Sequence, residues 1–198
     1  LLNVTNAYSM LANGGTLAKP RSYYYVTDNY GNILLSNDYE DKRVISEDTA
    51  SIMNIMLKNV VENGTGKAIT IKDKFETCAK TGTSGENKDK WFVGYTPYYL
   101  CGVWVGYDEQ KRISVGGEIS KQIFKKVMDI VHKDLPSIDF HVPDDVEQVG
   151  ICSSSNARAT SSCGSNAKNE WYVKGTAPTD YCSYHGSNSW NGYYPEGI

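Results

Sequence analysis

The amino-acid sequence predicts an α+β fold, in which helices pack on an antiparallel sheet and an irregular tail follows. Two short, almost uninterrupted apolar runs, 90–95 and 100–107, have the length and composition of strands that are covered on both faces. Apolar residues recur at helical spacing in 46–61 and again in 120–133. From Cys152 onward neither period persists, which indicates a tail without regular elements.

The N-terminal part is expected to hold a helix and a hairpin. Residues 3–13 place apolar side chains at roughly helical spacing and stop at two glycines, which favours a helix that ends there. Two β-prone runs, 23–27 and 33–35, flank the turn-forming residues 28–32. This arrangement is typical of a β-hairpin.

A longer helix is expected to begin at Ser46, whose hydroxyl can cap the first turn. Two acidic residues follow it, as the positive end of a helix dipole favours, and Asn63-Gly64 ends the element. Beyond a glycine-containing loop, 75–81 is expected to form the first of three neighbouring strands.

Leu135-Pro136 marks the predicted domain boundary. Residues 1–136 form the folded domain, and residues 137–198 comprise an extended linker over 137–150 and a cysteine-containing tail. With 40% hydrophobic and 22% charged residues the composition is that of a globular protein, and the formal net charge of −3 offers no basic surface for nucleic acid.

The string Lys80-Thr81-Gly82-Thr83-Ser84 carries the clearest chemistry. Successive strand residues point to opposite faces, so Lys80 and Gly82 share one side while Thr81 and Thr83 share the other. Hydroxyls and an ammonium at such an edge can hold a carboxylate, and the N–H of Thr83 can serve an oxyanion hole. A threonine- and glycine-rich strand end without function is the alternative.

Several further motifs stand in a fixed order around this string. It is followed by the runs WFVGYTP (91–97) and VWVGYD (103–108), and it is preceded by a motif-bearing stretch over 6–21 and by the loop 64–66. In these motifs the sequence resembles the C-terminal half of the penicillin-binding transpeptidase domain, class A type. The tail over 171–182 is similar to the C-terminal extension of some members.

The resemblance implies a partial serine β-lactamase/transpeptidase-like fold, with helices on both faces of the antiparallel sheet. It implies a peptidoglycan D,D-transpeptidase, a serine acyltransferase that cross-links stem peptides at their D-Ala-D-Ala ends, reacts with β-lactams and requires no cofactor. The protein would lie at the extracytoplasmic face of the bacterial cell membrane, anchored by an N-terminal segment. A D,D-carboxypeptidase, a β-lactamase or a non-enzymatic wall-binding remnant is the alternative.

Site roles follow by position in the motif. Lys80 would supply positive charge and Thr83 an oxyanion donor, so both are assigned to catalysis. The implied substrate-binding residues are Thr81, Gly82, Thr83, Ser84 and Trp91. For Trp91, a core aromatic is the alternative assignment.

Family enzymes carry S-x-x-K and S-x-N motifs before K-T-G. Here the matches at Ser165 and Ser154 follow Lys80, in reversed order, within a Ser/Asn-rich tail, and we interpret both as chance matches. The nucleophile is therefore expected in the missing N-terminal half of the same protein. The 198 residues alone are expected to fold poorly and to be inactive.

The cysteines allow two interpretations. Cys152, Cys163, Cys182 and His185 have the ligand types of a zinc site, but their spacing lacks the paired C-x₂₋₄-C knuckle. A Cys152–Cys163 disulfide is the interpretation favoured for an extracytoplasmic protein, with Cys182 left unpartnered and no metal assigned. Cys78 and Cys101 are expected to stay reduced, and His132 and His141 to lie at the surface.

Overall fold

The computed structural model describes residues 1–67, 69, 71, 75–114, 116 and 118–185. The chain divides into two compact units, Leu1–His141 and Val142–Ile198. The division falls after His141 rather than after Pro136, because the intervening segment is held by unit 1. The ring of Phe140 packs on Tyr95 with ring centroids 5.6 Å apart, and its N–H donates to Glu76.

Unit 1 contains three helices, seven strands and one short 3₁₀ turn among its described residues. In chain order they are α1 (Leu2–Ala12), β1 (Thr16–Ala18), β2 (Tyr25–Thr27), β3 (Ile33–Ser36), β4 (Asp41–Arg43), α2 (Glu47–Glu62), β5 (Cys78–Thr83), the turn Gly85–Asn87, β6 (Lys90–Tyr95), β7 (Leu100–Val105) and α3 (Ile119–Val131).

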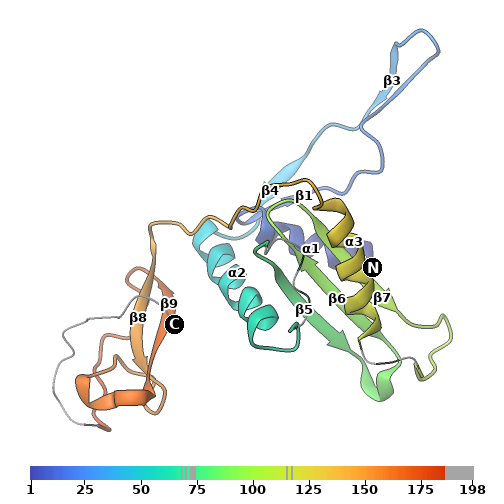
Figure 1. Cartoon of the computed structure of the whole chain (residues 1–198). Helices are drawn as coiled ribbons and strands as arrows, with labels where there is room; N and C mark the ends of the chain where they lie inside the picture. The colour runs from blue at the N-terminus through green and yellow to red at the C-terminus, as the bar shows by residue number, and fades with distance from the viewer. Residues whose placement is uncertain (68, 70, 72–74, 115, 117, 186–198) are drawn as a thin grey trace. The chain divides into compact units, whose positions relative to one another are not determined.

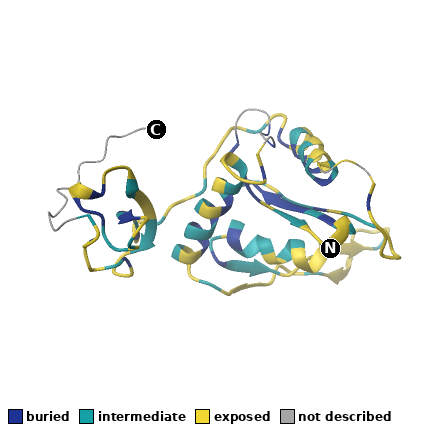
Figure 2. Ribbon diagram, turned by 90° about the horizontal axis from the view of Figure 1, so that it is seen from below, coloured by how far each residue is buried: buried dark blue, intermediate teal, exposed yellow. Residues whose placement is uncertain are grey.

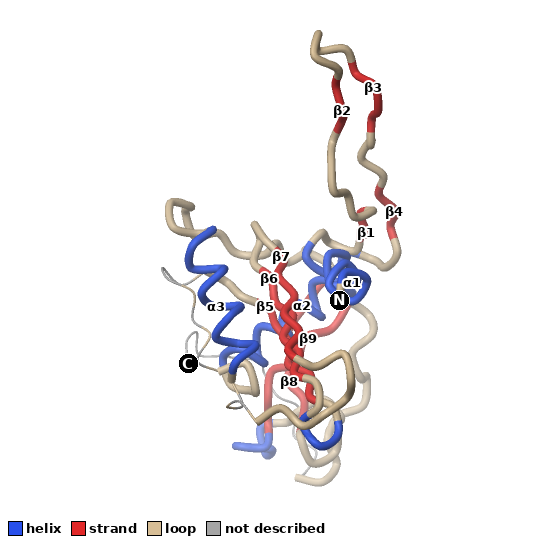
Figure 3. Tube along the Cα trace, turned by 90° about the vertical axis from the view of Figure 1, so that its right-hand side faces the viewer, coloured by secondary structure: helices blue, strands red, loops and turns tan. Residues whose placement is uncertain are grey.

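The centre of unit 1 is the antiparallel sheet β5-β6-β7, with helices on both faces (Figures 1 and 3). On one face, Phe124 of α3 packs against Phe92 of β6, with ring centroids 4.8 Å apart. On the other face, Leu11 of α1 and Leu57 of α2 pack against Tyr95. The central strand β6 is accordingly the most buried element of this unit (Figure 2). This confirms the predicted fold and strand order.

Gly94 shows how closely α3 approaches the sheet. A Cβ atom at this position would lie 2.8 Å from Cζ of Phe124 and 2.9 Å from Cβ of Ala79, both closer than such atoms approach in proteins. The absence of a side chain therefore allows the aromatic ring of α3 to rest directly on β6.

The predicted hairpin forms as β2 and β3, and the turn between them is built on Asp28. Its carboxylate accepts hydrogen bonds from the N–H groups of Tyr30 and Asn32, at 2.8 and 2.9 Å. Two further short strands, β1 and β4, pair with each other and were not predicted. Asp41–Arg43 carries no apolar residue and is exposed, so it offers no hydrophobic period.

Unit 2 corrects the prediction of an irregular tail. It contains the strands β8 (Val146–Cys152) and β9 (Ala167–Val173), which pair antiparallel, and a 3₁₀ segment over Ser161–Asn166. The last five residues of the expected linker 137–150 are thus part of a strand. The strands escaped prediction because β9 has only exposed and half-buried residues and shows no apolar alternation.

His132 is also corrected. It is buried, and its ring bridges the end of α3 to the β6–β7 turn, with Nδ1 2.8 Å from the Met128 carbonyl oxygen and Nε2 2.7 Å from Oγ1 of Thr96. His141 is exposed, as expected. Within the described part of the chain, no helix combines the length and apolar character that crossing a membrane requires.

Candidate active site

Strand β5 carries the K-T-G motif from the core to the surface. Cys78 and Ala79 are fully buried, whereas Lys80 and Thr83 are exposed. The two residues between them are half-buried. The buried start anchors the strand between the helices, and the motif occupies its accessible end.

Within the part of the chain that the structure describes, the backbone of β5 pairs with a neighbouring strand on one side only. Ser84 N–H donates to the Asp89 carbonyl, so the even-numbered residues of β5 form the hydrogen-bonded pairs with β6. The N–H and C=O groups of Thr81 and Thr83 consequently point to the opposite edge. Among the described residues no strand pairs with β5 at that edge.

The side chains of the motif divide between the two faces, as the strand period predicts. Lys80 faces the α1/α2 side, where it lines a hollow together with residues of both helices. Its ammonium reaches over the edge and donates to the Thr81 carbonyl oxygen at 3.0 Å. The Thr81 side chain lies on the other face, and its Oγ1 is 2.8 Å from Oγ1 of Thr65.

Thr65 is a site residue that the sequence reasoning missed. It lies in the loop that follows α2, between two glycines that pack on the last turn of that helix. A Cβ at Gly64 would lie 3.0 Å, and one at Gly66 2.9 Å, from the Val60 carbonyl oxygen. The Gly-Thr-Gly string could have indicated Thr65 from the sequence. Both glycines allow the close approach to α2 that brings this threonine to β5.

Gly82 and Trp91 pair across β5 and β6. A Cβ at Gly82 would lie 3.1 Å from Cβ of Trp91, so the indole has direct access to the β5 backbone. Trp91 is half-buried and lies beside Trp104, with ring centroids 6.4 Å apart. Its packing fits the core-aromatic alternative, while its half-exposed position leaves a substrate contact open.

Ser84 is engaged in the β5–β6 turn. Its Oγ accepts a hydrogen bond from the Asp89 N–H at 2.8 Å. Asn87 N–H donates to the Ser84 carbonyl, and Glu86 and Asn87 both have positive φ, at 59° and 55°. The hydroxyl therefore shapes the turn that ends the motif strand, and a role in substrate binding remains a prediction.

An open apolar hollow of about 470 Å³ lies beside Lys80. Its other lining residues come from α1 and α2 and are almost all apolar: Ala7, Tyr8, Met10, Leu11, Met53, Met56, Leu57 and Val60. An ammonium at the rim of an apolar surface is less hydrated than one in open water, which strengthens its interaction with a bound anion.

A buried polar network fixes β5 against α2. The Tyr95 hydroxyl donates to Oδ1 of Asn54 at 2.6 Å, and the Cys78 thiol donates to the Asn54 carbonyl at 3.2 Å. Nδ2 of Asn54 donates to the Leu11 carbonyl of α1 at 3.2 Å. Burial raises the pKa of Cys78 to about 12 and also raises that of Tyr95, so both groups stay protonated.

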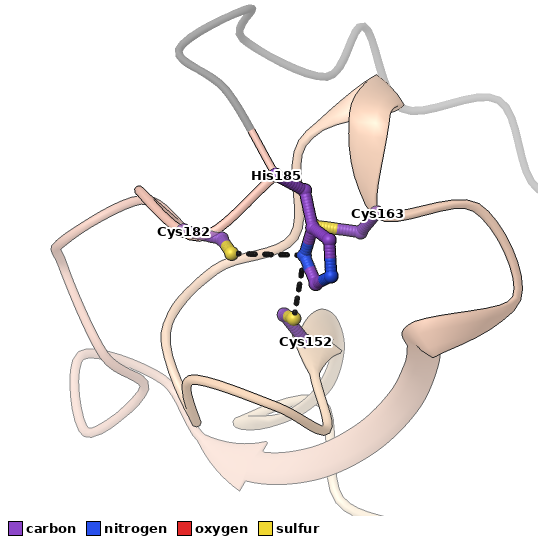
Figure 4. Close-up of side chains that lie close together, drawn as sticks. All are labelled: Cys152, Cys163, Cys182 and His185. Carbon is purple, nitrogen blue, oxygen red and sulfur yellow. Dashed lines mark hydrogen bonds between the residues drawn. The ribbon is translucent and has the colours of Figure 1, made fainter.

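In unit 2 the structure brings four side chains together. The thiols of Cys152, Cys163 and Cys182 and the imidazole of His185 have their ligand atoms within 4.8 Å of one another (Figure 4). All five cysteines are free, so the predicted Cys152–Cys163 disulfide is not formed, and Cys182 has a partner in His185. The sequence feature that would have indicated this cluster is Cys182-x₂-His185, which has the spacing of a zinc knuckle with histidine in place of the second cysteine.

Ser165 and Ser154, the two chance matches, lie in unit 2. Both are exposed, Ser165 in the 3₁₀ segment and Ser154 in the turn after β8. Neither is part of the β5 edge by sequence or by strand pairing.

Comparison with known proteins agrees with the division of the chain into units 1 and 2. The family model of the penicillin-binding protein transpeptidase domain matches residues 1–129, and that of the penicillin-binding protein 1A C-terminal domain matches residues 142–187. The second match begins at the first residue of unit 2. The crystal structure of penicillin-binding protein 1A from Haemophilus influenzae, 20% identical, covers 91% of this chain and 33% of its own with a TM-score of 0.75, which shows a common fold.

Curated relatives are closer in sequence. Penicillin-binding protein 1A of Clostridium perfringens is 32% identical over 189 residues, or 92% of this chain and 23% of the relative. That of Clostridium tetani is 35% identical over 193 residues, or 93% and 24%. The chain thus spans about a quarter of the length of these relatives. It belongs to the penicillin-binding protein transpeptidase family.

Proposed function

We propose that this chain forms the K-T-G wall of a serine D,D-transpeptidase site that acts on the D-Ala-D-Ala ends of peptidoglycan stem peptides. The observation that carries the proposal is the open edge of β5, where the backbone groups of Thr81 and Thr83 are unpaired by β6. A peptide laid along this edge gains main-chain hydrogen bonds as an added strand. Its terminal carboxylate would accept hydrogen bonds from the two threonine hydroxyls and would be attracted by the Lys80 ammonium.

The chemistry divides between this wall and a serine elsewhere in the protein. The serine oxygen bonds to the carbonyl carbon of the penultimate D-Ala, and the Thr83 N–H donates to the oxygen on which negative charge develops. The bond to the terminal D-Ala nitrogen breaks, and that amine leaves with the proton that the serine gave up. An amine of a second stem peptide then displaces the serine and forms the cross-link.

The chain's share of its relatives' length supports the placement of the nucleophile outside these 198 residues. The apolar hollow beside Lys80 supports it too, because an apolar surface of this kind favours a covering segment. In the whole protein we place the domain at the extracytoplasmic face of the cell membrane. The chain alone is expected to form no penicilloyl adduct, since nucleophile, base and oxyanion hole act as a unit.

Labelling with a fluorescent penicillin, followed by denaturing electrophoresis, tests the proposal on the 198-residue chain and on the whole protein that contains it. We expect a labelled band from the whole protein only. In the whole protein, Lys80→Ala and Thr81→Val should slow acylation by roughly 10²–10³-fold, as loss of a transition-state contact does.

Matched controls are Lys42→Ala on β4 and Thr27→Val on β2, both exposed strand residues away from β5. They should acylate at the unaltered rate. A labelled band from the 198-residue chain, or unaltered acylation of the Lys80 and Thr81 variants, would contradict the proposal.

A further inference from the structure

Few of the usual stabilising interactions are present in unit 2. Its regular structure is one two-stranded sheet, and a two-stranded sheet is marginal in water without further support. Its apolar core among the described residues consists of Val149, Ile151 and Ala177, with Tyr172 packed against it. Domains of this size have small cores and often gain stability from a disulfide or a metal ion.

The second cluster of buried residues in unit 2 supplies the groups for such a cross-link. Cys152, Cys163 and Cys182 are almost completely buried, at 0%, 2% and 1% exposure. The remaining members of this cluster are alanines. A thiol cluster lined by small side chains buries little hydrocarbon, so its contribution as an ordinary hydrophobic core is small.

The cluster has the dimensions of a tetrahedral metal site. Nδ1 of His185 lies 3.5 Å from Sγ of Cys152 and 3.4 Å from Sγ of Cys182 (Figure 4). Zinc–sulfur and zinc–nitrogen bonds of the usual lengths place sulfur and nitrogen about 3.6 Å apart across a tetrahedron. All four ligand atoms lie within 4.8 Å of one another, so they can surround a single ion.

The backbone around the cluster is already arranged for bound sulfur. Thr160 N–H points at Sγ of Cys163 at 3.3 Å. Hydrogen bonds of this kind stabilise the thiolate, the form that binds a metal.

The other ring nitrogen of His185 also has a neighbour. Nδ2 of Asn166 lies 3.4 Å from Nε2, and a half-turn of the amide presents its oxygen there instead. An acceptor at Nε2 fixes the proton on that nitrogen and leaves the lone pair of Nδ1 for a metal.

We propose that Cys152, Cys163, Cys182 and His185 bind one Zn²⁺ ion, through three thiolate sulfurs and Nδ1, and that this structural zinc folds unit 2. Each thiol loses its proton on binding, and the imidazole binds in its neutral form. Four protein ligands leave no position for water or substrate, which makes the site structural rather than catalytic. Three soft sulfurs with one nitrogen select zinc over the hard cations Mg²⁺ and Ca²⁺.

A disulfide accounts for less of the arrangement. Each of the three possible pairings leaves one buried thiol unpaired, and in two of them that thiol, Cys152 or Cys182, lies against the His185 imidazole. A single ion engages all four groups. Cys182 and His185, with two residues between them, bring Sγ and Nδ1 to 3.4 Å, as two ligands of one metal ion would.

The first test is the metal content of the 198-residue chain, purified without reductant or chelator and measured by mass spectrometry. We expect one zinc per chain and no disulfide among these cysteines. Cobalt substituted for zinc should give the intense visible bands of a tetrahedral site and a thiolate-to-metal charge-transfer band in the near ultraviolet. A chain that contains a disulfide in this cluster and no zinc overturns the proposal.

Variants identify the ligands. Cys182→Ser and His185→Ala should each weaken zinc binding by tenfold or more and alter the cobalt spectrum, whereas Cys101→Ser, a thiol of unit 1, should change neither. Because a ligand variant can also unfold, the wild-type chain is stripped with a chelator and reloaded. Recovery of one zinc and of the cobalt spectrum supports the proposal. A stripped, reduced chain that takes up no zinc, or ligand variants that bind as the wild type does, overturn it.

Discussion

The two units of this chain are stabilised by different chemistry. In unit 1, rings from helices on both sides press on a three-stranded sheet, as Phe124 does on Phe92. In unit 2, a two-stranded sheet carries a small apolar cluster, and three cysteines are among the most deeply buried side chains. Aromatic packing requires a sheet broad enough to be covered on both faces. A unit too small for that is stabilised by a few strong bonds instead.

The largest expected effect is the selective loss of unit 2 on metal removal. In the whole protein, a chelator should make the chain from Val142 onward sensitive to protease while Leu1–His141 stays resistant, because structural zinc supplies most of the folding free energy of small metal domains. Limited proteolysis with mass mapping measures this. Cys78 serves as an internal control, since its burial and its pKa of about 12 should keep it unalkylated at pH 8. Simultaneous cleavage of both units would show that they do not differ in this way.

The next effect concerns unit 1 and should be independent of metal. Phe124→Ala should lower the free energy of unfolding by about 3–5 kcal/mol, because it removes a fully buried ring and leaves a cavity over Gly94. Ile130→Ala, on an exposed position of the same helix, is the matched control and should change it little. Urea unfolding followed by tryptophan fluorescence compares the two variants. Equal losses in both would mean that α3 is not packed as described.

The smallest effect tests the polar network beneath the K-T-G strand. Tyr95→Phe should cost about 1–3 kcal/mol, since it leaves Oδ1 of Asn54 buried without the donor that now lies 2.6 Å away. Tyr99→Phe, a half-exposed tyrosine in the following turn, should be close to neutral. The same urea titration measures both. Zinc content should be unchanged in each, and a change would show coupling between the units.

Much of unit 1 was predictable because its signals are local. Strands covered on both faces appear as continuous apolar runs, and the run at Lys90–Tyr95 agrees with the structure at both ends. The helix α2 begins after Ser46, whose hydroxyl accepts the Thr49 N–H as expected of a cap. The strands of unit 2 gave no such signal, because β9 is half solvent-facing and its stability comes from groups elsewhere in the chain.

In the candidate sites, too, local features were predictable from the sequence, whereas contacts between distant residues were not. The facing of Lys80 and Thr81 follows from strand alternation and is confirmed by their contacts. That Thr65 meets Thr81, sixteen residues away, depends on how the loop after α2 packs, which a local pattern does not contain. The thiol cluster joins Cys152 to His185 across thirty-three residues. Its assembly requires the fold of unit 2 to be known first.

The unpaired edge of β5 also bears on how copies of the chain behave toward one another. Exposed strand edges invite pairing with the same edge of a second molecule, which is a route to aggregation. Here the Lys80 ammonium lies over the Thr81 carbonyl, so two edges that approach would bring like charges together. The lysine that we assign to catalysis therefore also opposes pairing between two copies of this edge, and its replacement would remove a barrier to self-association along with the positive charge of the site.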